Sequence, residues 1–248
     1  MKPFKAVTLL VILAVFGFLT LGSRMMKPHP TVVLGQDLTL SYPVANTIPS
    51  FPWLYIFFFV PFILFSILYA LVYKRSWTTA KVIYFMLLAF CINESVTNVM
   101  KNLTGRPRPC FFEMCEFENT DTNGGRKFGE FGKPVDVTRC YETKRRMDSL
   151  RSYPSGHSSD TMMDATFSLI LLVNYLNVFK GLKKVVRRWI LGIAALLLFL
   201  FPLYVGSSRI WDYKHRGDDV IAGFIVGFVS TLVAYFITFG VKWIVEKP

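Results

Sequence analysis

Long apolar runs alternate with shorter polar segments along this chain. Six of the runs approach the length of about 20 residues that a helix needs to span the hydrocarbon core of a bilayer, and they cover residues 6–22, 53–73, 81–100, 159–178, 189–207 and 219–242. A helix satisfies its backbone hydrogen bonds internally, as a segment surrounded by lipid must. The pattern therefore predicts an all-α integral membrane protein in which one domain, residues 1–248, forms a bundle of six transmembrane helices.

The first apolar run has two interpretations. It follows a short basic leader, residues 1–5, as the core of a secretory signal peptide does. No Ala-x-Ala-like cleavage site comes after it, however, and its 17 residues are long for a signal core. We expect a retained first helix and keep a cleaved signal peptide as the alternative.

The distribution of basic residues predicts how the bundle lies in the membrane. In a soluble protein a net charge of +12 would suggest a nucleic-acid partner, but the apolar runs indicate a lipid bilayer instead. The short segment 179–188 holds five basic residues: Lys180, Lys183, Lys184, Arg187 and Arg188. Short loops rich in lysine and arginine lie on the cytoplasmic side. We therefore expect both termini in the cytosol and the long loop 101–158, between the third and fourth helices, on the extracytoplasmic or lumenal side.

Three of the four cysteines, Cys110, Cys115 and Cys140, share this long loop. If the loop lies outside the cytosol, its oxidising surroundings permit a disulfide. Three cysteines cannot all pair with one another, and spacing does not determine which two would do so. A Cys115–Cys140 bond and no bond at all both remain open, and the spacings match no zinc-binding pattern.

Three polar patches occur at the ends of predicted helices. The first, "NVMKNLTGRPRP" (98–109), closes the third helix, and the second, "SYPSGHSS" (152–159), opens the fourth. The third is divided between "VGSSR" (205–209), at the end of the fifth helix, and "IWDYKHRGDD" (210–219), before the sixth. Because successive helices cross the bilayer in opposite directions, all of these segments come to one membrane face.

The first two patches carry groups that suit a phosphate. Lys101 and Arg108 offer cationic donors for phosphate oxygens. In the second patch, backbone N–H groups at a helix start can bind an anion, Gly156 would allow its close approach, and Ser155 can donate through its hydroxyl. Taken alone, each patch also fits a structural interpretation, as snorkelling cations at a helix end or as an ordinary Ser-Gly turn.

The third patch adds a candidate nucleophile and a further cation, Arg209. His215 and Asp219 lie four residues apart, one helical turn, so they can face each other if the sixth helix begins by residue 215. A carboxylate on one ring nitrogen fixes the imidazole tautomer and leaves the other nitrogen free to attack. A helix-start aspartate beside an interfacial histidine is the structural alternative. His157 in the second patch brings another imidazole to the same face, and this combination favours phosphate chemistry.

The order and spacing of the patches resemble the three-part signature of the type 2 phosphatidic acid phosphatase family, the membrane lipid phosphate phosphatases. The resemblance covers roughly residues 50–242 and rests on the following matches: Lys101, six residues, then Arg108-Pro109; Pro154-Ser155-Gly156-His157; and Ser208-Arg209, five residues, His215, three residues, Asp219.

The resemblance implies a reaction and a role for each matched residue. His215 would be the nucleophile that forms a phosphohistidine, Asp219 would orient it, and His157 would protonate the departing lipid alkoxide. The remaining matched residues would bind the substrate phosphate: Lys101, Arg108, Ser155, Gly156 and Arg209. Members of the family need no metal or other cofactor, and the implied substrates are phosphatidate, lysophosphatidate, and sphingoid or ceramide phosphates, in the plasma membrane or the endoplasmic reticulum.

Two other functions remain open from the sequence. A lipid or polyprenyl diphosphate phosphatase would use the same chemistry on a different substrate, whereas a scaffold or transporter with a basic vestibule would catalyse nothing. Retention of His157, His215 and Asp219 together favours an enzyme. Oligomeric state has no signal in the sequence.

Carboxylates inside the predicted spans form a further expectation. Glu94 lies on the helical stripe of Lys101, and Asp160 and Asp164 lie on the stripe of His157. Because ionisable groups within a membrane are costly unless they face the bundle or water, we expect these three carboxyls to point inward near the site. Interhelical hydrogen bonding is at least as good an explanation for them as catalysis.

Overall fold

The structure is a computed structural model that describes residues 3–29, 31–45, 63–64, 67, 71, 76–115, 130–137, 140, 143–178, 181 and 183–240. Five long helices dominate it: α1 (Pro3–Met25), α3 (Ser76–Thr104), α6 (Gly156–Val178), α7 (Lys184–Trp211) and α8 (Gly217–Phe239). The shorter elements are α4 (Phe111–Cys115), α5 (Thr143–Ser149), the 3₁₀ turn η1 (Leu38–Leu40), β1 (Val33–Leu34) and β2 (Pro134–Val135). The two short strands pair antiparallel, Val33 with Val135, and are the one departure from the all-α prediction among these residues.

Four of the helices are long and apolar enough to cross a membrane, namely Val7–Met25, Thr79–Thr104, Lys184–Trp211 and Gly217–Phe239. They coincide with the predicted spans 6–22, 81–100, 189–207 and 219–242, although α8 ends at Phe239, where Gly240 adopts a φ of 64°. The chain is therefore a mostly helical membrane protein.

The other two predicted spans, 159–178 and 53–73, are not among the four apolar helices. The span at 159–178 is a helix, α6, but it is not among the four apolar ones because serine, threonine and aspartate fill its first turns. The span at 53–73 lies almost entirely outside the described residues. The six-helix bundle, its single domain and the sidedness of its loops therefore stay predictions.

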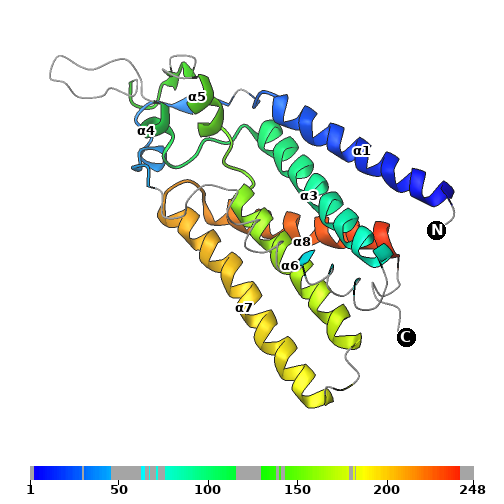
Figure 1. Ribbon diagram of the computed structural model, residues 1–248. Helices are drawn as coiled ribbons and strands as arrows, with labels where there is room; N and C mark the ends of the chain where they lie inside the picture. Colours follow the sequence, from blue (N-terminus) through cyan, green and yellow to red (C-terminus); the bar gives the residue numbers. More distant parts are fainter. Residues whose placement is uncertain are drawn as a thin grey trace.

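Helix α6 is the most enclosed of the long helices and packs against α3, α7 and α8 (Figure 1). Phe85 of α3 and Met163 and Phe167 of α6 are completely buried in the main apolar core. Two glycines let α8 approach closely: a Cβ added at Gly223 would meet the Ser155 carbonyl oxygen at 2.5 Å, and one at Gly227 would meet the Ser159 carbonyl oxygen at 2.0 Å. Small residues permit such backbone contact between membrane helices, and here they set the first turns of α6 and α8 side by side.

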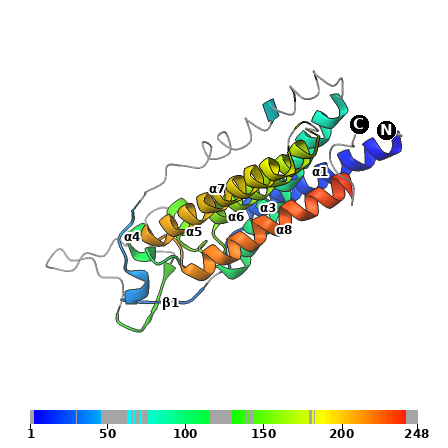
Figure 2. The ribbon, with the colours of Figure 1, turned by 90° about the horizontal axis from the view of Figure 1, so that it is seen from below.

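A second apolar cluster forms a cap at one end of the bundle. We use "cap" for residues 31–45, 110–115, 130–137, 140 and 143–151, which include α4, α5 and the strand pair. Its buried members are Val33, Leu40, Phe111, Phe112, Cys115, Cys140 and Leu150. Figures 1 and 2 show α4 and β1 at the end of the bundle where α3 and α7 finish and α6 and α8 begin.

A disulfide closes the cap. It joins Cys115, at the end of α4, to Cys140, 25 residues further along the chain. The pairing that the sequence left open is thereby confirmed, while Cys110 and Cys91 are free thiols.

Candidate active site

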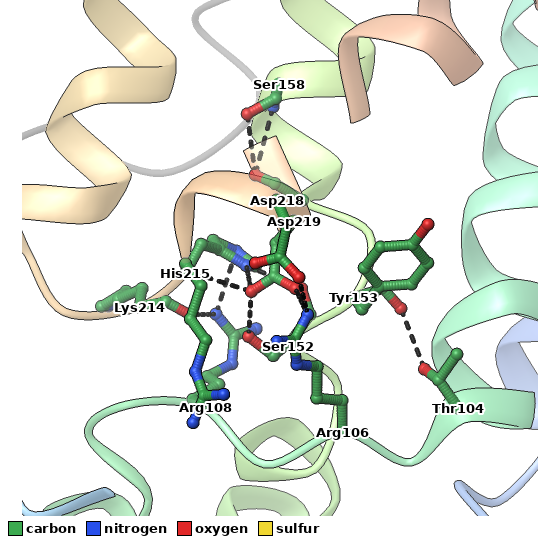
Figure 3. A network of polar contacts seen from close by, with 12 residues as sticks. Thr104, Arg106, Arg108, Ser152, Tyr153, Ser158, Lys214, His215, Asp218 and Asp219 are labelled. Atoms are coloured by element: carbon green, nitrogen blue, oxygen red, sulfur yellow. Dashed lines mark hydrogen bonds and ion pairs between the residues drawn. The ribbon is translucent and has the colours of Figure 1, made fainter. Parts of the chain in front are cut away.

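The three polar patches meet at the end of the bundle beneath the cap. Arg106 and Arg108 extend from the segment after α3 toward His215 and Asp219, at the turn into α8 (Figure 3). The start of α6 lies against the same turn, because the Ser155 amide donates to the Asp219 carbonyl at 2.9 Å. The prediction that these distant stretches share one face agrees with this geometry.

His215 is held at both ring nitrogens. It lies in the turn that connects α7 to α8, its side chain is buried, and its Nδ1 lies 2.7 Å from the Ser152 carbonyl oxygen. A carbonyl can only accept a hydrogen bond, so in the neutral ring Nδ1 carries the proton and Nε2 carries the lone pair. Arg108 Nη1 donates to that Nε2 at 3.2 Å. The ring nitrogen that could act as a nucleophile therefore faces a guanidinium group.

Asp219 lies beside His215 but does not form the hydrogen bond that we expected. Its Oδ2 is 3.8 Å from Nδ1, beyond hydrogen-bond range. The expectation required the helix to begin by residue 215, whereas α8 begins at Gly217, so the two residues do not share a full helical turn. The Ser152 carbonyl orients the imidazole instead, and Asp219 acts on it through charge.

The Asp219 carboxylate is fully buried and has other donors. Ser152 Oγ donates to its Oδ2 at 2.6 Å, and the Arg216 amide donates to the same oxygen at 2.8 Å. Arg106 Nη1 donates to its Oδ1 at 2.8 Å and also pairs with the exposed Asp218. Ser152 thus connects the carboxylate to the imidazole, because its hydroxyl binds the first and its carbonyl binds the second.

Lys101 and the start of α6 lie together. A Cβ added at Gly156 would stand 2.8 Å from Lys101 Nζ, so the absence of a side chain at position 156 admits the ammonium group. Ser158 Oγ donates to Ser155 Oγ at 2.9 Å, which leaves the Ser155 hydroxyl proton available for an acceptor. The two predicted phosphate-binding positions at the start of α6 therefore adjoin a cation, at Gly156, or offer a donor, at Ser155.

Arg209 and His157 complete the predicted set. Arg209 is almost completely buried, lies 2.8 Å from the Asp212 carboxylate, and accepts the His215 amide on its carbonyl at 3.2 Å. His157, half-buried in the first turn of α6, interacts electrostatically with four groups of the site: Arg209, His215, Lys101 and Arg108. All eight residues predicted from the sequence are therefore associated with this end of the bundle.

The surroundings of His215 favour a neutral imidazole. Burial lowers the pKa of His215 to about 4, and the positive charges of Arg108 and Lys101 act in the same direction. The neighbouring Asp219 carboxylate opposes them by raising this pKa. At neutral pH the ring consequently keeps its lone pair.

Three residues of the site were not predicted from the sequence to be functional groups. Arg106 lies within the first polar patch and Ser152 within the second, so their closeness in sequence to the motif residues could have indicated a role at the site. Asp148 binds Arg108 through its carboxylate and its backbone carbonyl, but it comes from the long loop and has no motif to mark it.

The three carboxyls inside the helices are buried, as expected, but two of them make contacts between helices. Glu94 pairs with Arg24 of α1 at 2.5 Å, and Asn93 Nδ2 donates to Asp160 Oδ1 at 2.6 Å. Asp164 has no hydrogen-bond partner among the described residues. Structural roles therefore explain Glu94 and Asp160 better than catalysis does. Among the same residues, no group of three or more histidine, cysteine, aspartate or glutamate side chains is arranged to hold a metal ion.

Long apolar helices that carry cationic side chains and a buried imidazole at one end define a membrane protein with a polar site at its helix ends. A family model of the PAP2 superfamily matches residues 78–243, and the chain belongs to that superfamily. It is accordingly a phosphatase, and the family expected from the motifs is confirmed.

Individual relatives support the assignment. The chain is 29% identical over 222 residues to a probable diacylglycerol pyrophosphate phosphatase 1 of Schizosaccharomyces pombe, covering 85% of this chain and 73% of that protein. It is 31% identical over 235 residues to lipid phosphate phosphatase 1 of Arabidopsis thaliana, covering 91% and 65%. A putative phosphatidate phosphatase of Drosophila melanogaster is 32% identical over 152 residues, covering 57% and 37%. No solved structure matches the chain.

Proposed function

We propose that this protein hydrolyses lipid phosphate monoesters through a phosphohistidine formed on His215, without a metal ion. The observation that carries the proposal is the state of the His215 ring: its Nδ1 proton is committed to the Ser152 carbonyl, and its Nε2 lone pair faces Arg108 Nη1. A buried, neutral imidazole beside a guanidinium group is suited to attack a phosphorus atom whose oxygens the guanidinium holds.

In the first step, His215 Nε2 attacks phosphorus and the bond from phosphorus to the lipid oxygen breaks. Protonated His157 gives its proton to that oxygen, so the lipid leaves as an alcohol. Burial and the positive charges of Arg209, Lys101 and Arg108 lower the pKa of His157 to about 2 in the free site. The negative charge of a bound phosphate favours the protonated form of a neighbouring imidazole, so we propose that His157 acquires its proton when the substrate phosphate is bound. The products are a phosphohistidine at position 215 and a neutral His157.

In the second step, His157 accepts a proton from a water molecule whose oxygen attacks the same phosphorus. The phosphorus–nitrogen bond breaks, inorganic phosphate leaves, and His157 is protonated again for the next cycle. The Nδ1–H bond to Ser152 holds the ring in place in both steps, while Asp219 stabilises the positive charge that the ring acquires.

Charge on the transferring phosphoryl group would be stabilised by the cations of the site. Lys101, Arg108 and Arg209 supply three positive charges, and Ser155 and the Gly156 amide supply uncharged donors. Such preorganised donors are the main catalytic resource in phosphoryl transfer, because the transition state is spread over the equatorial oxygens.

Several observations support a lipid as the substrate. The site lies at the ends of membrane-spanning helices, where the headgroup of a bilayer lipid is placed. The Cys115–Cys140 disulfide favours an oxidising compartment, and therefore an extracytoplasmic or lumenal site in the plasma membrane or the endoplasmic reticulum. Two relatives are named lipid phosphate phosphatase and phosphatidate phosphatase.

A lipid diphosphate is the second candidate substrate. It is favoured by relatives named diacylglycerol pyrophosphate phosphatase in S. pombe and Saccharomyces cerevisiae, which are 29% and 28% identical to this chain. The same nucleophile and general acid would serve, with a phosphomonoester in place of the lipid alkoxide as the leaving group.

The test is phosphate release by the purified full chain in detergent with EDTA, from a panel of lipid monophosphates and diphosphates. We expect turnover by the wild type and none by His215→Ala. His29→Ala is the matched control, because His29 is the third histidine of the chain and is exposed in the segment after α1. Full activity of His215→Ala would remove the proposed nucleophile, and activity confined to diphosphates would establish the second candidate.

A further inference from the structure

Arg108 is bound on the side away from the nucleophile by one residue of the cap. Its Nε donates to the Asp148 carbonyl oxygen at 2.8 Å, and its Nη2 donates to Asp148 Oδ1 at 2.9 Å. The remaining terminal nitrogen, Nη1, faces the Lys214 carbonyl at 3.3 Å and His215 Nε2 at 3.2 Å. Asp148 thus holds one edge of the guanidinium plane and directs the other edge toward His215.

We propose that Asp148 is a positioning residue for phosphoryl transfer, which keeps the Arg108 guanidinium aimed at the phosphoryl group on His215. The proposal rests on the proposed function. An arriving phosphate oxygen would replace His215 Nε2 as the acceptor of Nη1, while Nε and Nη2 stay bound to Asp148. Arg108 would then keep one orientation when Nε2 is free, when it attacks, and when it carries the phosphoryl group.

The contacts of Asp148 with Arg108 favour a role in positioning the guanidinium over that of a simple surface ion pair. A long arginine side chain has considerable rotamer freedom, and an isolated exposed pair contributes little net stability. Arg108 is instead buried and is bound to two acceptors of the same residue, which fixes the rotation of the guanidinium plane as well as its place. Fixed donors are what a phosphoryl-transfer site requires, since displacements of about 1 Å can reduce the rate by about 10²-fold.

The backbone that carries Asp148 is attached to the Arg108 segment. The Arg108 amide donates to the Ser149 carbonyl at 2.8 Å, and the Ser152 amide donates to the Arg106 carbonyl at 3.0 Å. Leu150 is buried in the cap cluster that also contains the Cys115–Cys140 disulfide. The cap therefore fixes the carboxylate relative to the cation that it holds.

The charge of Asp148 also indicates that any benefit to catalysis comes from where this residue places Arg108. Its partial burial would raise the pKa of Asp148, but the positive charges of Arg108 and Lys101 lower it below its ordinary value, so the carboxylate is ionised at neutral pH. A negative charge beside a phosphate site opposes substrate binding. A net benefit from Asp148 must therefore come from the placement of Arg108.

Three variants separate placement from charge. Asp148→Asn keeps an oxygen that can accept from Nη2 and removes the charge. Asp148→Glu keeps the charge and displaces the acceptor by one methylene, and Asp148→Ala removes the carboxylate. Asp37→Asn is the control, because Asp37 lies on the same cap and, among the described residues, its carboxylate bonds only within its own turn, to Thr39. Asp148 is more than half exposed, so folding of these variants is expected and is checked by thermal unfolding in detergent.

The readouts are kcat, KM and the pH profile of phosphate release from a lipid monophosphate vesicle or micelle. We expect Asp148→Asn to keep kcat near the wild-type value with an equal or lower KM. Asp148→Ala and Asp148→Glu should lose about 10- to 100-fold in kcat. The acidic limb of kcat/KM should also move to higher pH in Asp148→Glu, because this variant keeps the carboxylate charge while a displaced Arg108 no longer lowers the pKa of His215. The charged or titratable groups that interact with His215 are Arg108, Lys101, Asp219, His157 and Asp148 itself.

The outcomes distinguish this inference from the proposed function. If the wild type releases phosphate, His215→Ala does not, and all three Asp148 variants match the wild type, the positioning role is wrong and the function stands. If Asp148→Asn is as impaired as Asp148→Ala, the charge matters more than the placement and the inference is overturned. If the wild type releases no phosphate from any lipid, both proposals fail.

Discussion

Ser152 forms hydrogen bonds with both His215 and Asp219. Its carbonyl accepts from His215 Nδ1 at 2.7 Å, and its hydroxyl donates to Asp219 Oδ2 at 2.6 Å. One residue of the segment before α6 therefore links the imidazole to the carboxylate that lies 3.8 Å away. This arrangement replaces a direct histidine–aspartate hydrogen bond with two bonds to a shared neighbour.

Ser152→Ala should separate these two contacts. The substitution retains the backbone carbonyl that orients His215 but leaves the buried Asp219 carboxylate without its shortest hydrogen bond. Loss of a bond to a buried charged group costs about 1.5–3 kcal/mol, so we expect kcat to fall by about 10- to 100-fold if Asp219 supports the charged ring in the transition state. Steady-state kinetics of the purified variant, with Ser41→Ala on the cap as the control, test this. An unchanged kcat would show that the charge of Asp219 does not depend on Ser152.

The pH dependence of phosphorylation should report the low basicity of His215. The neutral ring attacks and the protonated ring cannot, so activity is lost as pH falls through the pKa of His215. Because burial and Arg108 lower that pKa to about 4, the phosphorylation rate should persist well below the ordinary histidine pKa of about 6.5. Rapid mixing with a lipid phosphate, followed by an alkaline quench that preserves phosphohistidine, measures the rate at each pH. A limb centred near 6.5 would mean that the ring is less buried than the structure indicates.

The apolar runs, the family and the clustering of the motifs could be predicted from the sequence, because each depends on local composition or on the spacing of residues within short motifs. Helix α6 could not be predicted as well from hydropathy. Its first turns are polar because they line the site and face α8, so it is not among the four apolar helices. The role of the Ser152 carbonyl was unpredictable, since every residue has a carbonyl and only the fold selects one. Asp148 reaches Arg108 through the disulfide-closed cap, and residue spacing carries no information on such a long-range contact.

Gly227→Ala should disturb the contact between α6 and α8. The added Cβ would lie 2.0 Å from the Ser159 carbonyl oxygen, so the backbones must separate. Overpacking of this kind costs about 1–3 kcal/mol, and it should also reduce kcat/KM because the Ser155–Asp219 contact lies two turns away on the same helix pair. Gly192→Ala in α7 is the control, since nothing lies within 4 Å of its added Cβ. Thermal unfolding in detergent compares the two, and equal midpoints would show that the helices are not in tight contact.

Removal of the Cys115–Cys140 disulfide should make the cap less rigid and weaken the hydrogen bonds between Asp148 and Arg108. A cross-link between positions 25 residues apart contributes about 3 kcal/mol by restricting the unfolded chain. We expect the double variant Cys115→Ser, Cys140→Ser to unfold at a lower temperature and to lose kcat more than substrate affinity, because the carboxylate of Asp148 is displaced while Lys101 and Arg209 remain on their helices. Cys91→Ser is the matched control, since Cys91 is a free thiol in α3. If the double variant unfolds earlier yet retains full kcat, the disulfide stabilises the fold without being needed at the phosphate site, and the backbone bonds between the Arg108 segment and residues 149–152 suffice to keep Asp148 in place.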